Sequence, residues 1–478
     1  MPHPQIIQGG MGVGVSGWAL ARAVSQQNQL GVVSGTALAI IMARRLQLGD
    51  VGGHMRRGMA HFPIPGMAER ILAKYYIAGG KPANQPFKAM PVPSVQLSTD
   101  LLELTVVSNF VEIFLAKEGH KGLVGVNYLE KVQLPALASL FGAMLAGVDY
   151  VLMGAGVPRA IPGVLDRLAN GETAQLRIDV PQSQPGEEAI STLDPQAFCG
   201  GQAPKLKRPF FLAIVSSATL ASVLARKASG RVDGFVVEGK TAGGHNAPPR
   251  GPLHLNERGE PIYSARDIPD VKGIRELGLP FWLAGSYADP ERLAEAKQLG
   301  AAGVQVGTAF AFCEESGILP ELKRRVIEKA RAGSIDVFTD PLASPTGFPF
   351  KVLRLENTLS DAEVYAQRKR YCDVGYLRSA YRKSDGSVGF RCPAEPVEQY
   401  LLKEGSAEDT CNRKCACSGL MATVGLGQIQ PNGKPELPLV TAGEDAARVA
   451  RFLKGSAQSY TAADVIRYIL ADQNAPKR

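Results

Sequence analysis

Short, continuous apolar runs recur along the first two thirds of this chain and constrain its fold more than any other feature. Each run ends in Gly, Ser or Asn, and most are separated by sequence with helical periodicity. Apolar runs without polar alternation are typical of strands buried on both faces, as in a parallel sheet with helical crossovers. The runs cover residues 5–7, 30–35, 122–127, 149–154, 210–215, 234–237, 280–285 and 303–307.

Eight such runs within about 310 residues favour one α/β fold, a (β/α)8 TIM barrel, over an open doubly wound sheet. We expect the barrel to span residues 1–335, with insertions at about 50–120 and 171–208. Long insertions on a barrel usually cover its active face, so we expect both insertions there.

The regular alternation stops after the eighth run. Residues 336–478 are expected to form an α-rich extension packed on the barrel as a cap. Within it the sequence predicts a charged helix over 360–370 and a final helix over 462–471.

Composition excludes several classes of protein. The 478 residues are 45% hydrophobic and 21% charged, as in globular proteins with ample core. No apolar stretch reaches membrane-spanning length and no secretory signal is visible, so we expect a cytoplasmic protein without a membrane partner. The net charge of +8 is modest and lacks basic repeats interleaved with aromatic residues, which argues against nucleic-acid binding.

The chain has an odd number of cysteines, seven, and no visible export signal, which together argue against a disulfide framework. Four of them fall late, at Cys392, Cys411, Cys415 and Cys417. Four thiolates could hold a metal, but this spacing matches no familiar zinc or iron–sulfur pattern. We therefore predict free thiols and no metal site.

The run at residues 236–245 carries the clearest candidate for catalysis. A buried strand end passes into a Gly-rich turn that presents His245. Glycine allows a flat ligand to approach the backbone, and histidine titrates near neutrality, so this is a candidate proton-transfer group. From this run alone, a glycine turn with an incidental surface histidine is an equally good interpretation.

The last two runs end in Gly285-Ser286 and Gly307-Thr308. In an α/β barrel the loops after strands seven and eight commonly bind phosphate through free backbone N–H groups. Ordinary glycine turns and helix caps are the alternative.

Two further strand ends are candidates for ligand contact. Gly9, Gly10 and Met11 follow the first run, and Asn127 ends the third, where an amide could pair with a heterocycle edge. The glycines match the dinucleotide fingerprint only imperfectly, which argues against a Rossmann fold. For Asn127, a turn cap is an equally good interpretation.

Three segments together resemble a known family. QGGMGVGVSG near the start, VEGKTAGGH in the middle and LAGSYADPERLAEAKQLGAAGVQVGTAFAF afterwards resemble the nitronate monooxygenase (2-nitropropane dioxygenase-like) flavoproteins. The trans-acting enoyl reductases of polyunsaturated fatty-acid and polyketide synthases are similar. The resemblance covers roughly residues 4–335 and implies a TIM barrel that binds FMN without a covalent link.

The resemblance also implies roles for individual residues. His245 matches the active-site histidine, Asn127 would lie near the flavin pyrimidine edge, and the two late glycine–hydroxyl pairs would hold the phosphate. The implied cofactor-binding residues are Gly9, Gly10, Met11, Asn127, Glu238, Gly243, Gly244, Gly285, Ser286, Gln305, Gly307 and Thr308.

The chain departs from the family pattern at several positions. Glu238 stands where the family often has Gln, Ser286 replaces the second glycine of the phosphate loop, and residues 246–250 replace the usual Arg-Gly after the histidine. The segment at 344–351 resembles the enoyl-reductase branch instead. These differences leave the expected flavin intact and keep the substrate open.

Three functions are compatible with these features. The first is FMN-dependent oxidation of alkyl nitronates by dioxygen to a carbonyl compound and nitrite, with His245 positioning or deprotonating the substrate. The second is an NAD(P)H-dependent FMN reductase of enoyl thioesters or quinones, with a possible acyl-carrier partner. The third is a flavin-binding accessory subunit whose extension docks a partner. A homodimer is compatible with each.

Overall fold

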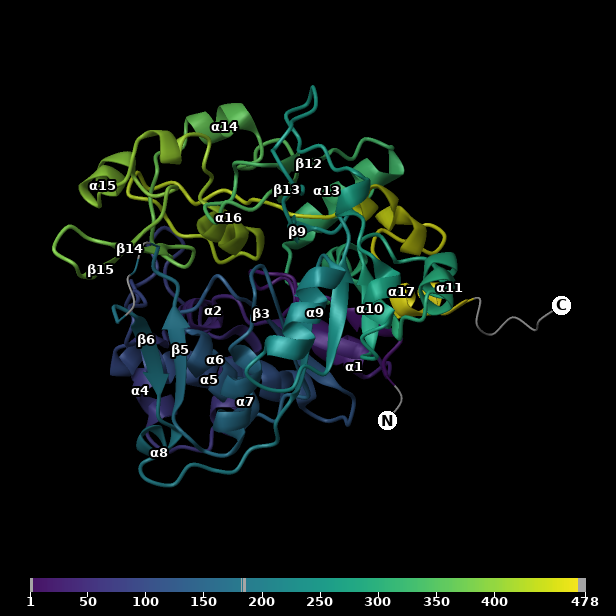
Figure 1. Ribbon diagram of the computed structural model, residues 1–478. Coiled ribbons are helices and arrows are strands. Elements are labelled where there is room, and N and C mark those ends of the chain that lie inside the picture. Colours follow the sequence, from purple (N-terminus) through teal and green to yellow (C-terminus); the bar gives the residue numbers. More distant parts are fainter. Residues whose placement is uncertain (1–2, 182, 184–185, 472–478) are drawn as a thin grey trace.

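Eight parallel strands close into a barrel in the computed structural model, which describes residues 3–181, 183 and 186–471 (Figure 1). The strand order around the barrel is β1-β11-β10-β8-β7-β4-β3-β2. The expected TIM barrel is therefore confirmed. Its strands are β1 (Ile6–Gln8), β2 (Leu30–Ser34), β3 (Val124–Leu129), β4 (Tyr150–Gly154), β7 (Phe210–Val215), β8 (Gly234–Glu238), β10 (Phe281–Ala284) and β11 (Gly303–Val306).

The strands are buried on both faces, as their unbroken apolar sequence predicts. In β7 only Phe210 is exposed, and Ile214 is partly buried. In β8 every residue but Glu238 is buried, and β2 is buried throughout. Parallel pairing aligns the strand ends, since Ala284 pairs with both Glu238 and Gln305 on its two neighbours. The residues that follow each strand therefore meet at one end of the barrel.

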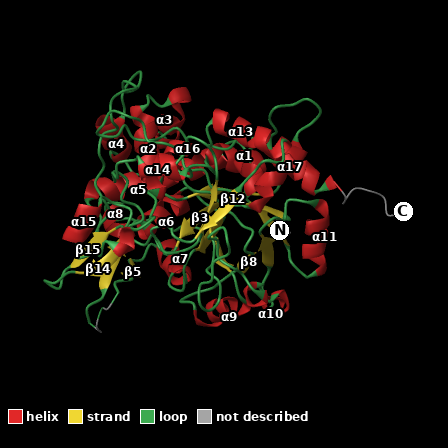
Figure 2. Ribbon diagram, turned by 90° about the horizontal axis from the view of Figure 1, so that it is seen from above, coloured by secondary structure: helices red, strands yellow, loops and turns green. Residues whose placement is uncertain are grey.

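Helices cover the outside of the barrel, and Figure 2 places α7, α9, α10 and α11 around its strands. In α13 the buried face includes Leu322, Val326 and Ala330, at helical spacing, whereas α6 is buried along almost its whole length. The covering helices are α1 (Trp18–Ser25), α2 (Leu38–Gln47), α5 (Thr99–Lys117), α6 (Ala136–Leu145), α7 (Ile161–Ala169), α9 (Ala218–Lys227), α10 (Val271–Arg275), α11 (Pro290–Gln298), α12 (Thr308–Ala311) and α13 (Pro320–Arg331).

The first insertion forms a satellite of the barrel. The helices α3 (His54–Met59) and α4 (Met67–Tyr75) pack on α5 through a second apolar cluster that includes Met59, Ile71 and Leu104. The second insertion folds into the antiparallel hairpin of β5 (Ala174–Ile178) and β6 (Ala189–Leu193), followed by α8 (Pro195–Phe198).

Most of the chain after residue 335 lies across the top of the barrel in Figure 1, whereas its last helix lies at the side, next to α11. One apolar cluster joins it to the barrel, because Ile6 and Val304 belong to the same cluster as Leu439 and Val465. Its helices are α14 (Ala362–Ala366), α15 (Val397–Leu402), α16 (Ala416–Thr423) and α17 (Ala462–Ile469), with a 3-10 helix at η4 (Glu444–Phe452). Its strands are β12 (Val337–Asp340), β13 (Phe350–Leu353), β14 (Ser379–Arg382) and β15 (Val388–Arg391).

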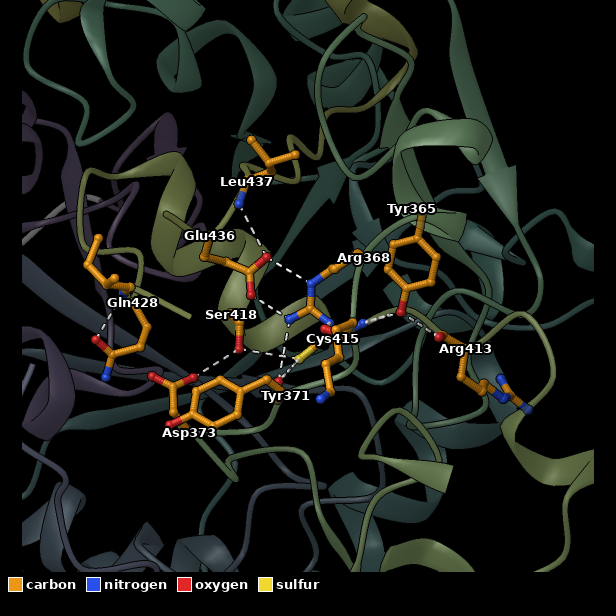
Figure 3. A network of polar contacts seen from close by, with 12 residues as sticks. Tyr365, Arg368, Tyr371, Asp373, Arg413, Cys415, Ser418, Gln428, Glu436 and Leu437 are labelled. Carbon is orange, nitrogen blue, oxygen red and sulfur yellow. Dashed lines mark hydrogen bonds and ion pairs between the residues drawn. The ribbon is translucent and has the colours of Figure 1, made fainter. Parts of the chain in front are cut away.

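Two features of this extension differ from the expectation. The helix predicted over 360–370 is only the short α14, because Arg368 leaves the helix and turns inward to Glu436. The guanidinium and carboxylate are both nearly inaccessible to solvent, and they form two hydrogen bonds (Figure 3). The strand pairings were also not predicted; β13 pairs with both β12 and the two-residue β9 (Gly244–His245).

The late cysteines are free thiols in this structure. Cys411 is exposed, whereas Cys392, Cys415 and Cys417 are buried, and burial raises the pKa of the Cys392 thiol. Across the described ranges no group of three His, Cys, Asp or Glu side chains is arranged to hold a metal. Nor does any helix there have the length and apolar character needed to cross a bilayer.

Candidate functional site

A cavity opens at the carboxyl ends of the barrel strands, and all eight strands contribute to its wall. This is the end at which α/β barrels build their active sites. The structure brings all the residues expected from the sequence to this one cavity. They are Gly9, Gly10, Met11, Asn127, Glu238, Gly243, Gly244, His245, Gly285, Ser286, Gln305, Gly307 and Thr308.

The floor beside β1 is made of backbone. A Cβ on Gly10 would lie 2.4 Å from the Cβ of Asn127, so no larger residue fits there without displacing β3. The Asn127 amide donates a long hydrogen bond of 3.4 Å to the Gly10 carbonyl. Asn127 therefore supports the glycine backbone as well as lining the cavity.

The next two strands around the barrel from β1, β11 and β10, end in the two glycine–hydroxyl pairs. Gly285 has φ +103° and Ser286 has φ +59°, both in the left-handed region that favours glycine. The turn therefore bares backbone N–H groups even though its second residue is serine. Thr308 also lines the cavity, but its hydroxyl already accepts a hydrogen bond of 2.9 Å from the Gly443 N–H.

Glu238 is the last residue of β8, and its side chain lines the cavity. No hydrogen bond or ion pair to its carboxyl is found among the described residues, and burial raises its pKa to about 7. Two strands away, the Oε1 atom of Gln305 is buried without a hydrogen-bond partner. Two polar groups in the wall are thus left without protein partners, which indicates a ligand that supplies them.

His245 is held at the cavity wall by the extension. It pairs with Phe350 in the β9–β13 ladder, and its ring packs 4.8 Å from the Phe350 ring. Its Nε2 atom lies 2.7 Å from the Ser344 hydroxyl, which in turn lies 2.8 Å from the Thr346 hydroxyl. Within the described chain Nδ1 has no hydrogen-bond partner, so this nitrogen is free for a substrate.

Burial lowers the pKa of His245 to about 4. The imidazole is therefore neutral near pH 7, with one nitrogen donating and one accepting. A neutral ring with a low pKa suits hydrogen bonding and orientation of a substrate better than strong general-base catalysis.

The roof of the cavity was missed from the sequence. It includes Tyr376, Cys417, Thr441 and Asp445, all from the extension. Thr441 accepts a hydrogen bond of 3.1 Å from the Gly244 N–H and so fastens the turn that carries the histidine. Only the segment at 344–351 gave a sequence signal, through its resemblance to the enoyl-reductase branch.

The two insertions were expected to cover the active face, but their described residues do not line this cavity. No residue of 50–120 or 171–208 is among the described residues that line the cavity, whereas the extension supplies its roof. Within the first insertion, α3 and α4 instead pack on its last helix, α5, through an apolar cluster of their own.

The residues present fit a flavin mononucleotide. A flat ring needs the close backbone approach that Gly9 and Gly10 provide, and its polar edge could meet the unpartnered Gln305 Oε1 atom. A phosphate needs bared N–H groups, which the left-handed turn at Gly285 and Ser286 supplies. Both requirements are met within one cavity.

Comparison with known proteins agrees with the sequence motifs. Residues 172–341 match the model of the nitronate monooxygenase family, a segment that holds β8, His245 and both glycine–hydroxyl pairs. The family resemblance inferred from the sequence is therefore confirmed.

Individual relatives match over shorter stretches. A probable nitronate monooxygenase of Staphylococcus haemolyticus is 32% identical over 139 residues, 28% of this chain and 37% of that protein. The (3aS,4S,5R,7aS)-5-hydroxy-7a-methyl-1-oxo-octahydro-1H-indene-4-carboxyl-CoA dehydrogenase of Mycobacterium tuberculosis is 31% identical over 146 residues, 30% of this chain and 36% of that protein. The matches thus span little more than a third of these relatives.

Among solved structures, FabK from Thermotoga maritima aligns with 98% of this chain and 92% of its own. The TM-score is 0.48 and the sequence identity 17%.

Proposed function

We propose, from the family that residues 172–341 match, that this protein is an FMN-dependent oxidoreductase that oxidises alkyl nitronates with dioxygen. The observation that carries the proposal is the single cavity in which a glycine floor, two glycine–hydroxyl turns and His245 meet. We also propose a cytoplasmic location, which rests on the sequence alone.

The chain's own residues would bind and orient the reactants. Gly9, Gly10 and Met11 would lie against the flavin ring, and Gly285 and Ser286 would hold its phosphate through backbone N–H groups. When bound, FMN supplies a ring that can take up and pass on electrons. The carboxyl of Glu238, which is partly protonated near pH 7, and the amide of Gln305 would bind the polar edge of the ring.

His245 would act on the substrate through Nδ1, the nitrogen without a protein partner. Ser344 fixes the other ring nitrogen and hence the orientation of the imidazole. A neutral imidazole can hydrogen-bond the nitro oxygens of a nitronate, which is already deprotonated and needs no strong base. This preference for the nitronate over the neutral nitroalkane follows from the low pKa of His245.

A second candidate is an NAD(P)H-dependent reductase of enoyl thioesters or quinones. The segment that orients His245 is the one that resembles the enoyl-reductase branch, and one relative is a carboxyl-CoA dehydrogenase. In this reaction the neutral Glu238 carboxyl is the group in the cavity able to deliver a proton near pH 7.

Anaerobic titration of the FMN-loaded protein separates these candidates. We expect the flavin absorbance to bleach on addition of propyl-2-nitronate and to recover with dioxygen. Bleaching by NADPH, without a response to the nitronate, would replace the first candidate with the second.

The variant His245→Ala tests the assigned substrate contact. We expect turnover to fall by roughly 100-fold while the flavin stays bound, since the imidazole contacts substrate and is held by the extension. Full turnover in this variant would remove His245 from both mechanisms.

A further inference from the structure

A second cavity lies beside the first and shares one wall with it. Tyr376 lines both cavities, with its two neighbours Gly375 and Leu377 lining one each. The second cavity is also bordered by the loop after β3, whose preceding residues line the first. Tyr376 thus separates the two cavities, and a ligand that occupied both would have to pass it.

The segments that build the second cavity lie outside the barrel. It is enclosed by the β5–β6 hairpin of the second insertion and by the β14–β15 hairpin of the extension. Ile178 and Val180 pack against Ala380 in an apolar cluster, and Arg382 donates to the Ser183 hydroxyl at 3.0 Å. The second insertion and the extension thus both contribute to the second cavity, and their two hairpins lie next to each other in Figure 1.

The wall of this cavity combines apolar surface with positive charge. Lys131, Arg177 and Arg378 line it, against one carboxylate, Asp179, which already accepts a hydrogen bond of 3.2 Å from Gln133. Apolar residues from the same loops and hairpins complete the wall. Such a lining suits a ligand with an apolar stem and an anionic end.

The three cations are only weakly neutralised by the protein. Lys131 has no ion pair in the described structure, and Arg378 donates to the carbonyls of Gly375 and Pro93 rather than to a carboxylate. Arg177 pairs with Glu188 across 3.8 Å, with both side chains substantially exposed. Asp179, Glu188 and Glu130 lie near these cations, so an entering anion would meet positive charge that is only partly compensated.

The aromatic ring of Phe348 lies between the ammonium of Lys131 and the ring of His245. The Lys131 ammonium lies 5.2 Å from the centre of the Phe348 ring, and that ring lies 6.3 Å from the ring of His245. Lys131 is thus separated from His245 by a single side chain.

We propose that the second cavity binds the anionic end of an elongated substrate whose reacting end lies beside His245. The anion is a phosphate or a carboxylate, and Lys131 and Arg177 select for it. This inference rests on the proposed function for the reacting end only; binding of the anionic end is independent of turnover.

Paired ligands that differ in charge test this inference. 4′-Phosphopantetheine is compared with pantetheine, which lacks its phosphate, and octanoate is compared with octanamide. Binding to the FMN-loaded protein is measured by calorimetry. We expect the charged member of at least one pair to bind about tenfold more tightly, and the pair that responds identifies phosphate or carboxylate.

The double variant Lys131→Gln/Arg177→Gln should abolish this preference and leave binding of the neutral partners unchanged. Both side chains are exposed, so folding is not at risk. The control is Lys272→Gln/Arg324→Gln, which removes one lysine and one arginine that line neither cavity and should keep the preference.

Equal binding of charged and neutral ligands in both pairs, or a preference that survives in the double variant, would overturn the inference. The same titrations on FMN-free protein keep the two proposals apart. A protein that retains no flavin but prefers the anionic ligands refutes the proposed function and supports the second cavity.

Discussion

The floor and the roof of the main cavity are built by different means. The floor consists of strand ends and glycines, such as Gly10 and Gly285, and presents mostly backbone. The roof comes from the extension and presents side chains, held by buried polar networks such as Arg368 with Glu436. A backbone floor suits a cofactor that binds through ring and phosphate, whereas a side-chain roof can vary with the substrate.

Mutations in the floor and in the roof should therefore have different consequences. Changes in the floor should act on flavin affinity, and changes in the roof should act on folding of the extension and on substrate. His245 lies where the two meet, since β9 belongs to the barrel's turn and pairs with β13 of the extension.

The largest effect is expected from the variant Glu436→Ala in the roof. It leaves the Arg368 guanidinium buried without its carboxylate, which should lower the free energy of unfolding by about 3–5 kcal/mol. Urea denaturation measures it. Glu363→Ala, an exposed glutamate on α14, is the control and should change stability by less than about 0.5 kcal/mol. Equal effects would mean that the buried pair does not support the roof.

The next largest effect is expected at Glu238 in the floor, whose titration should make the free energy of unfolding depend on pH. Its folded pKa of about 7 lies above the ordinary value of 4.5, so the flavin-free folded state loses stability as pH rises through this window. Glu238→Gln should therefore be more stable than the unmodified protein at about pH 8, by on the order of 2–3 kcal/mol.

The difference in the free energy of unfolding between Glu238→Gln and the unmodified protein should be smallest near pH 4.5. His245 contributes the opposite dependence, because its lowered pKa destabilises the folded state as pH falls below about 6.5. Taking the difference between Glu238→Gln and the unmodified protein cancels the His245 contribution. A difference that does not grow with pH would contradict a neutral Glu238.

A smaller effect is expected from Gly285→Ala. Its φ of +103° is unfavourable for alanine, and the new Cβ would lie 2.8 Å from the Thr241 hydroxyl. We expect FMN affinity, measured by fluorescence quenching, to fall about tenfold. Gly278→Ala shares the left-handed conformation but lies in open space, so it should lower stability by about 1 kcal/mol and leave FMN affinity unchanged. Equal losses of FMN affinity in Gly285→Ala and Gly278→Ala would mean that the turn at Gly285 does not bind the phosphate.

The smallest effect is expected from Ser286→Gly. Glycine relieves the left-handed backbone and should raise stability by about 0.5–1 kcal/mol. Ala155→Gly relieves a similar conformation in the same cavity wall without removing a hydroxyl. If only Ser286→Gly weakens FMN binding, the hydroxyl assists the backbone; if both do, glycine flexibility is responsible.

The floor could be predicted from sequence because it follows from local patterns. Apolar runs located each strand to within two residues, and Gly9, Gly285 and Gly307 mark their ends. Most of the roof could not be predicted in this way, since Tyr376, Thr441 and Asp445 carry no local signal and meet only through tertiary packing. The helix predicted over 360–370 was too long for the same reason, because the distant Glu436 draws Arg368 out of it.

The most direct test of the account is whether the barrel mouth holds FMN. The purified protein is incubated with FMN, passed through gel filtration and examined by its visible absorbance spectrum. We expect oxidised-flavin bands to elute with the protein in equimolar amount, and to be greatly reduced in Gly285→Ala. Protein that elutes colourless after reconstitution would contradict the central claim.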